Sequence, residues 1–194
     1  MGHVTTSATD RGTVAVCAVV PAPFGPLVVA VSGGEVTDVR FPHADGTAAT
    51  EGLGVQVDLD GSAPDADPVP VDPVLVEAVR QLTDYLAGER RAFDLPLRLR
   101  GSAFRQRVWQ GLRAVPYGTT TTYGALATSV GLDPRTTARA VGAANGANHL
   151  PVVVPCHRVI GADGTLTGFA GGLEVKRELL TLEARVAAGA GTLF

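Results

Sequence analysis

The sequence predicts an α+β (α/β) fold in two parts: a sheet-and-helix domain over residues 1–100 and a helix-turn-helix domain over residues 101–194. Short β-rich segments punctuated by glycine and proline occupy the start of the chain, whereas helical periodicity begins near residue 101. The charge divides at the same place. Residues 1–100 carry 7 Lys/Arg and 14 Asp/Glu, and residues 101–194 carry 9 and 5. With 45% hydrophobic residues, the 194-residue chain can form a core.

The N-terminal part is expected to begin with a small antiparallel sheet. Its strands are predicted at residues 14–20, 27–31 and 36–41, and the sequence SGGEV at 32–36 favours a hairpin turn between the last two. Cys17 lies within the first strand and is expected to be inert core filling.

One helix and two less regular segments complete this part. Asp72 and Pro73 are typical of a helix start, and Gly88 of its end. The apolar stripe of this helix is predicted to consist of Val76, Val79, Leu82 and Leu86. Residues 43–70, rich in Asp, Gly, Ala and Pro, are predicted to be a long mobile surface loop, and residues 93–99 a final strand.

The C-terminal part is expected to be mainly helical. Ser102 can cap a helix that stops at residues 116–118, and its buried face is predicted to comprise Phe104, Val108, Leu112 and Val115, with Trp109 beside them. Thr122 can cap a helix at 123–130, and Asp133-Pro134 can start another at 135–147. These two, joined at Gly131, form a helix-turn-helix pattern. We expect a strand at 152–155, a loop at 161–172 and a last helix at 173–187.

The composition argues against a membrane or secreted protein. The N-terminus is polar and lacks an apolar signal core, and the run at 14–20 is too short to span a bilayer. The two cysteines, Cys17 and Cys156, belong to no metal-binding cluster, so we expect free thiols, a cytoplasmic location and no metal or cofactor.

The helix at 135–147 is unusually poor in large side chains. Gly142 and Gly146 lie inside it, and each costs about 1 kcal/mol relative to alanine. A smooth surface serves either close helix packing or contact with a nucleic-acid groove, and it suits the minor groove better than the major groove. Arg139 would then be a single long cation on a smooth face.

Cys156 and His157 are adjacent in the stretch VVVPCHRVIG, residues 152–161. Neighbouring residues do not face each other on a helix and point to opposite sides of a strand, so direct pairing is not expected. Cysteine reacts as the thiolate, and its ordinary pKa of about 8.5 leaves little thiolate at neutral pH. Cys156 is therefore either a thiol activated by a nearby base or a small hydrophobe beside a surface imidazole.

Glu183 lies at the edge of the apolar stripe of the last helix. That stripe is formed by Val175, Leu179, Leu182 and Val186. Glu183 is either a solvated flank residue or a half-buried carboxylate that needs a partner such as His157. A carboxylate on one ring nitrogen fixes the imidazole tautomer and makes the other nitrogen more basic. Cys156, His157 and Glu183 would then form a reactive thiol site, with a cysteine hydrolase as the alternative.

Four segments carry a family resemblance: TTYGALA, ARAVGAANGAN, PCHRVIG and LTGFAGGLEVKRELLTLE. Together they resemble the O6-alkylguanine-DNA alkyltransferases, the methylated-DNA–protein-cysteine methyltransferases. The match is strong from Phe104 to Glu183, and the N-terminal half matches in pattern through FGPLVVAVSGGEVTDVRF. The resemblance implies a ribonuclease H-like N-terminal domain and a winged-helix-like C-terminal domain. It also implies repair of O6-methylguanine, and more slowly O4-methylthymine, in double-stranded DNA, with the alkyl group passing irreversibly to the protein.

The same resemblance implies roles around the reactive thiol. Cys156 would be the alkyl acceptor, and His157 the base, acting through a water molecule. Glu183 would orient His157, and Asn148 would support the site by hydrogen bonding. Tyr123 would rotate the target phosphate and donate a proton to the departing guanine.

Further residues are implied to contact DNA or the flipped base. Arg139 would fill the gap left by the base, and the other expected DNA contacts are Thr119, Thr121, Tyr123, Arg135, Ala138, Ala140 and Gly142. The base pocket is expected to contain the backbone carbonyls of Cys156 and Val159 and the residues Trp109, Pro151, Arg158, Val159, Phe169 and Ala170. Phe169 and Ala170 stand where family members commonly have tyrosine and, in some cases, serine, so two hydroxyl groups are missing.

The expected partner is double-stranded DNA containing O6-alkylguanine, bound by a monomer. Some family members bind zinc near the N-terminus, but residues 1–100 contain only Cys17, His3 and His43 as cysteine or histidine here. Cooperative binding along DNA stays an open alternative. So does a non-catalytic binder of alkylated lesions, although the presence of Cys156 favours transfer.

Overall fold

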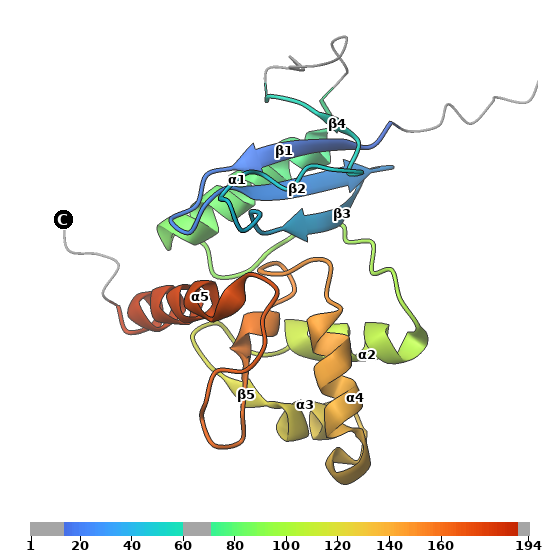
Figure 1. Ribbon diagram of the computed structural model, residues 1–194, viewed down its shortest axis with the longest axis vertical. Helices are drawn as coiled ribbons and strands as arrows, with labels where there is room; N and C mark the ends of the chain where they lie inside the picture. The colour runs from blue at the N-terminus through green and yellow to red at the C-terminus, as the bar shows by residue number, and fades with distance from the viewer. Residues whose placement is uncertain (1–13, 60–70, 190–194) are drawn as a thin grey trace, which may run out of the picture.

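The computed structural model describes residues 14–59 and 71–189 (Figure 1). A sheet with one long helix forms the N-terminal part, and helices arranged around two very short strands form the C-terminal part beneath it. This arrangement confirms the predicted α+β class.

The N-terminal sheet has the strand order β3-β2-β1-β4. Its members are β1 (Val16–Val20), β2 (Leu27–Ser32), β3 (Glu35–Arg40) and β4 (Val55–Gln56). β1, β2 and β3 pair antiparallel, as predicted, and β4 joins β1 in parallel. The hairpin between β2 and β3 needs left-handed backbone, which Gly33 and Gly34 adopt with φ of 61° and 73°. The helix α1 (Pro73–Ala87) packs against β1 and β2.

Two N-terminal predictions need correction. β4 lies inside the segment 43–70 that was predicted to be an irregular loop; residues 60–70 of that segment lie outside the described residues. Residues 93–99 form no continuous strand. Only two backbone hydrogen bonds join this segment to β3, so Leu97 and Val36 form an isolated bridge and not a strand pair.

The buried face of α1 also differs from the prediction. Val76 is 40% exposed, so it does not belong to the apolar stripe. The residues of α1 that face the core are Leu75, Ala78, Val79, Gln81, Leu82 and Tyr85. Tyr85 is absent from the predicted stripe, but its ring is fully buried.

The C-terminal part follows the predicted helices closely. Its elements are α2 (Ala103–Arg113), β5 (Thr121–Thr122), α3 (Tyr123–Ser129), α4 (Pro134–Gly146), the 3₁₀ turn η1 (Cys156–Arg158), β6 (Val159–Ile160) and α5 (Gly172–Ala187). Ser102, Thr122 and Asp133 cap α2, α3 and α4 through their side-chain oxygens, as predicted. α3 and α4 pack together at the end of the molecule opposite the sheet (Figure 1).

The strand predicted at residues 152–155 is wrong, because this segment is a buried turn that leads into η1. The side chain of Asn148 binds backbone groups in and before this segment, as a neighbouring strand would otherwise do. The Asn148 amide donates to the carbonyl of Val154 at 2.8 Å, and its oxygen accepts from the N–H of Leu150 at 3.0 Å. Val152 has φ of 72°, a conformation that β-branched residues rarely adopt. The turn therefore places Cys156 at a rigid, buried position.

The two parts contact each other next to this turn. The N–H of Val39 in β3 donates to the carbonyl of His149 at 2.9 Å. Phe41, which follows β3, packs edge-on against Phe169 in the loop before α5, with ring centroids 5.1 Å apart. The N-terminal part thus supports the segments that surround Cys156. Within the described ranges, no helix is long and apolar enough to cross a membrane.

Candidate active site

Glu183 lies at the centre of a buried hydrogen-bond network. It projects from α5, and its side chain is 0% exposed. Its carboxylate accepts hydrogen bonds from the Tyr85 hydroxyl, the Gly118 N–H, Nε2 of His157 and the Arg158 guanidinium. Burial by itself would raise the pKa of Glu183, but the bonds from His157, Arg158 and Tyr85 outweigh it and lower that pKa to about 2. The carboxylate is therefore ionised and held in one orientation.

The ionised Glu183 determines the tautomer of His157. A carboxylate can only accept hydrogen bonds, so Nε2 of His157, 2.9 Å from Oε1 of Glu183, must carry the proton. Nδ1 then has the free lone pair, and it is buried without a hydrogen-bond partner among the described residues. Burial lowers the pKa of His157 against the opposing effect of Glu183, so the ring is neutral at pH 7. His157 can therefore accept a proton at Nδ1.

Cys156 opens the turn η1, beside His157, and is 3% exposed. Burial raises the pKa of its thiol to about 11, although a hydrogen bond involving Asn148 and the positive charge of Lys176 act in the opposite direction. At neutral pH the thiol is therefore protonated. It needs a base before it can react as a nucleophile.

Lys176 brings a buried ammonium group close to this thiol. Its side chain is 0% exposed, and Nζ donates to the carbonyl oxygens of Val159 at 2.6 Å and Thr167 at 2.8 Å. Burial lowers the pKa of Lys176, and the neighbouring Cys156 raises it. In the described ranges no carboxylate pairs with this ammonium. Its charge is therefore available to stabilise a thiolate at Cys156.

An open groove of about 670 Å³ lies between α3, α4 and the loop before α5. Its lining consists of Tyr123, Ala138, Arg139, Gly142, Gly146, Thr167, Gly168, Phe169 and Ala170. The Tyr123 hydroxyl lies 2.8 Å from Oγ1 of Thr167, which joins α3 to the loop. The ring of Phe169 is 6.4 Å from that of His157. The groove is therefore next to the Cys156–His157–Glu183 cluster.

The glycines of α4 belong to this groove. A Cβ added at Gly142 would lie 3.7 Å from the Tyr123 ring, which is an ordinary contact, and one added at Gly146 would meet nothing within 4 Å. Close helix packing therefore does not require either glycine. The small side chains instead leave an open surface from which Arg139 projects.

The other residues expected at the DNA or base site lie in several places. Thr119, Arg135 and Ala140 are exposed, and Thr121 and Ala138 are half-buried, around the helix-turn-helix. Pro151 and Ala170 line a smaller cavity beside β3. Val159 lies in β6 and is fully buried.

Trp109, Pro151, Arg158 and Val159 were expected in the base pocket but do not line the groove. Two of them, Trp109 and Arg158, have other partners inside the protein. Trp109 is fully buried in α2, and its indole N–H donates to the carbonyl of Ala144 at 2.8 Å, so it joins α2 to α4. Arg158 points into the protein, where it binds Glu183 and the carbonyl of Val115. It lines a separate cavity with Arg91 and Tyr117. Both side chains therefore stabilise the site from inside the protein and do not face the groove.

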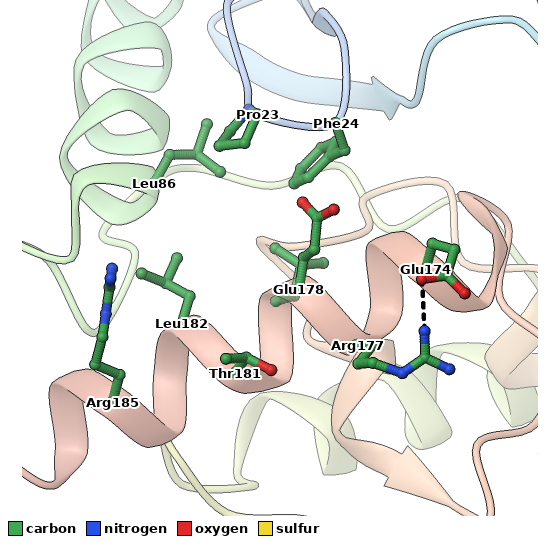
Figure 2. A pocket seen from close by; sticks show the side chains of 10 residues that line it. Pro23, Phe24, Leu86, Glu174, Arg177, Glu178, Thr181, Leu182 and Arg185 are labelled. Atoms are coloured by element: carbon green, nitrogen blue, oxygen red, sulfur yellow. Dashed lines mark hydrogen bonds and ion pairs between the residues drawn. The ribbon is translucent and has the colours of Figure 1, made fainter.

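A further cavity of about 330 Å³ lies between α5, the connection from β1 to β2 and the end of α1 (Figure 2). Figure 2 shows Glu178, Thr181 and Arg185 along one face of α5, opposite Pro23 and Phe24. The described residues that line it include no cysteine or histidine. Glu183 and Lys176 face the other side of the same helix, so this cavity is separate from the reactive cluster.

Three members of the cluster were not predicted: Tyr85, Gly118 and Lys176. Lys176 had a detectable signal, because it shares a helical face with Leu179 and Glu183 at a spacing of three and seven residues. Tyr85 and Gly118 had none, since their contacts with Glu183 span 98 and 65 residues. Among the described residues, no group of three or more His, Cys, Asp or Glu side chains gathers as a metal site.

The fold and the site define a class of protein in which a helix-turn-helix domain carries a buried cysteine supported by a histidine and a carboxylate. Residues 15–99 match the family model of the 6-O-methylguanine DNA methyltransferase ribonuclease-like domain, and residues 103–185 match that of its DNA-binding domain. The chain belongs to the methylated-DNA–protein-cysteine methyltransferase family of DNA repair proteins.

Similar proteins with this name occur in several organisms. That of Mycobacterium bovis is 42% identical over 175 residues, which cover 90% of this chain and 96% of the relative. The constitutive protein of Bacillus subtilis is 51% identical over 112 residues, 57% of this chain and 67% of the relative. A crystal structure of the Mycobacterium tuberculosis O6-methylguanine methyltransferase has a TM-score of 0.68 and 39% identity, covering 88% of this chain and 93% of the other. A complex of the protein from that organism with DNA has a TM-score of 0.69 and 40% identity, covering 88% and 94%.

Proposed function

We propose that the protein repairs O6-methylguanine, and more slowly O4-methylthymine, in double-stranded DNA by transferring the alkyl group to its own Cys156. The observation that carries this proposal is the buried chain from Glu183 to His157, next to Cys156 and a groove lined by small residues. We also propose a domain boundary near residue 100, because the two family matches end and begin at residues 99 and 103.

The proposed reaction is a displacement at the alkyl carbon. The Cys156 thiol passes its proton to Nδ1 of His157 through a water molecule, and Sγ attacks the carbon in line with its bond to O6. The S–C bond forms as the C–O6 bond breaks, and the electron pair passes into the purine, which takes up a proton from Tyr123. The thioether product has no good leaving group, so each protein molecule reacts once.

The target carbon is inaccessible inside a duplex, so the base must leave the stack at a cost of a few kcal/mol. Docking of the smooth face of α4 in the minor groove offsets part of this cost. Arg139 is exposed on that face and is proposed to fill the gap left by the base. Thr119, Thr121 and Arg135 are proposed to contact the backbone around it.

The site of transfer can be tested with duplex DNA that carries labelled O6-methylguanine. After digestion of the protein, mass spectrometry should find at most one methyl group per molecule, on Cys156. Cys156→Ala should take up none. Cys17→Ala is the matched control, because Cys17 is buried in β1 away from the cluster, and it should still take up one. Release of label over many turnovers would contradict the proposal, and binding without transfer would support a lesion binder.

Arg139→Ala should slow repair of duplex DNA by about 10- to 100-fold, because the extrahelical base loses the side chain that replaces it in the stack. Reaction with free O6-benzylguanine needs no flipping and should change less than about two-fold on the same argument. Single-turnover rates on both substrates provide the measurement. Arg113→Ala removes an exposed charge at the end of α2 and should leave both rates near wild type. Equal losses on the two substrates would mean that Arg139 has a structural role.

A further inference from the structure

Tyr85 reaches the reactive cluster from the N-terminal part of the chain. It lies near the end of α1, and its side chain is fully buried. Its hydroxyl donates to Oε1 of Glu183 at 2.6 Å and lies 3.4 Å from Nε2 of His157. Phe93 and Tyr117 pack against its ring, with centroid distances of 5.2 and 6.0 Å. The ring is therefore fixed, and its hydroxyl is directed at the carboxylate.

The Tyr85 hydroxyl and the His157 imidazole share one acceptor atom. Both bind Oε1 of Glu183, whereas the Gly118 N–H binds Oε2. Burial and the charge of Glu183 raise the pKa of Tyr85 well above its usual value. The hydroxyl therefore remains a donor throughout the pH range in which His157 titrates. It restrains Oε1 between α1 and the turn η1.

We propose that Tyr85 is a positioning residue for alkyl transfer: its hydroxyl holds Oε1 of Glu183 against Nε2 of His157 and so keeps Nδ1 as the basic nitrogen. This inference rests on the proposed function, in which His157 takes the proton of Cys156. Tyr85 acts through Glu183 and His157. Because it lies in α1, the N-terminal part of the chain also helps to position the base. Phe41 supports the loop before α5, but Tyr85 contacts the proton relay itself.

Tyr85→Phe removes the hydroxyl and keeps the ring. We expect the single-turnover rate with free O6-benzylguanine to fall about ten-fold, because Oε1 of Glu183 is no longer held in place against Nε2 of His157. The inflection of the pH–rate profile should move to higher pH, since a carboxylate with one donor fewer stabilises protonated His157 more strongly. Affinity for duplex DNA should change less than about two-fold, because the groove is untouched.

Tyr117→Phe is the matched control. Tyr117 packs against Tyr85, and its buried hydroxyl has no hydrogen-bond partner in the part of the chain that the structure describes. This variant should keep the wild-type rate and the wild-type inflection. Thermal unfolding of both variants would show that each one folds.

¹⁵N NMR of the His157 ring, assigned with His157→Gln, gives a readout that needs no substrate. Tyr85→Phe should raise the pKa of the ring, and Tyr117→Phe should leave it unchanged. Unchanged spectra together with unchanged rates would overturn the proposal and reduce Tyr85 to a packing residue. A wild-type protein that transfers no alkyl group would contradict the proposed function alone, because the NMR change would still be expected.

Discussion

Replacement of His157 by glutamine is expected to slow alkyl transfer at pH 7 by about 100- to 10,000-fold, the range typical for loss of a general base. The Cys156 thiol has a pKa raised to about 11 by burial. At pH 7 only about one thiol in 10⁴ would then ionise without help. Glutamine keeps an N–H that can reach Glu183 but provides no basic nitrogen, so the change removes the base and leaves most of the packing.

The pH profile distinguishes this effect from structural damage. In the wild type, the rate should level off above the pKa of His157, which burial lowers from 6.5. In His157→Gln, the rate should instead rise about ten-fold per pH unit from pH 7 toward the pKa of the thiol. Single-turnover rates with free O6-benzylguanine between pH 6 and 10 would provide the test. His149→Gln is the control and should follow the wild type, and a level profile in His157→Gln would argue against His157 as the base.

Glu183→Gln is expected to lower the free energy of unfolding by about 3–5 kcal/mol at pH 7, because it leaves the buried Arg158 guanidinium without its counter-ion. The carboxylate of Glu183 only accepts hydrogen bonds, from Tyr85, Gly118 and Arg158 among others. The glutamine amide group would direct its own N–H hydrogens at some of these donors. Denaturant unfolding monitored by circular dichroism measures the loss. Glu178→Gln is the control. Glu178 lies on the exposed face of α5, so this change should alter the free energy of unfolding by less than about 0.5 kcal/mol.

The pH dependence of this stability difference has a definite sign. The folded-state pKa of Glu183 is lowered from 4.5 to about 2, so its contribution is fully present above pH 4.5. It is lost as the pH falls from 4.5 toward 2 and the carboxylate takes up a proton in the folded state. The gap between wild type and Glu183→Gln should therefore narrow across that window. A gap that stays constant down to pH 2 would contradict the assignment of an ionised Glu183.

Local sequence signals predicted the helices well, because their determinants are close together in the chain. Ser102, Thr122 and Asp133 cap the helices they were expected to start. Glu183 was placed at the edge of an apolar stripe, and a buried carboxylate needs a partner, which made His157 a candidate. The hydrogen bond between these two residues is present in the structure.

Features that depend on distant or side-chain-to-backbone contacts could not be predicted in this way. Residues 152–155 have the composition of a strand, but Asn148 binds their backbone and makes them a turn. β4 pairs with β1 over a long intervening stretch, and no periodicity marks a strand of two residues. The contact of Tyr85 with Glu183 spans 98 residues, and nothing in the local pattern of α1 indicates it.

These separations along the sequence also affect when the site can form during folding. Glu183 collects its hydrogen bonds from partners that precede it by 98, 65, 26 and 25 residues. Contacts of such separation require long loops to close and therefore form late. α5 is also the last of the described helices to leave the ribosome. A nascent chain that has exposed Cys156 but not yet α5 lacks the carboxylate that orients His157, so the proposed reaction at Cys156 requires α5 to be synthesised and folded.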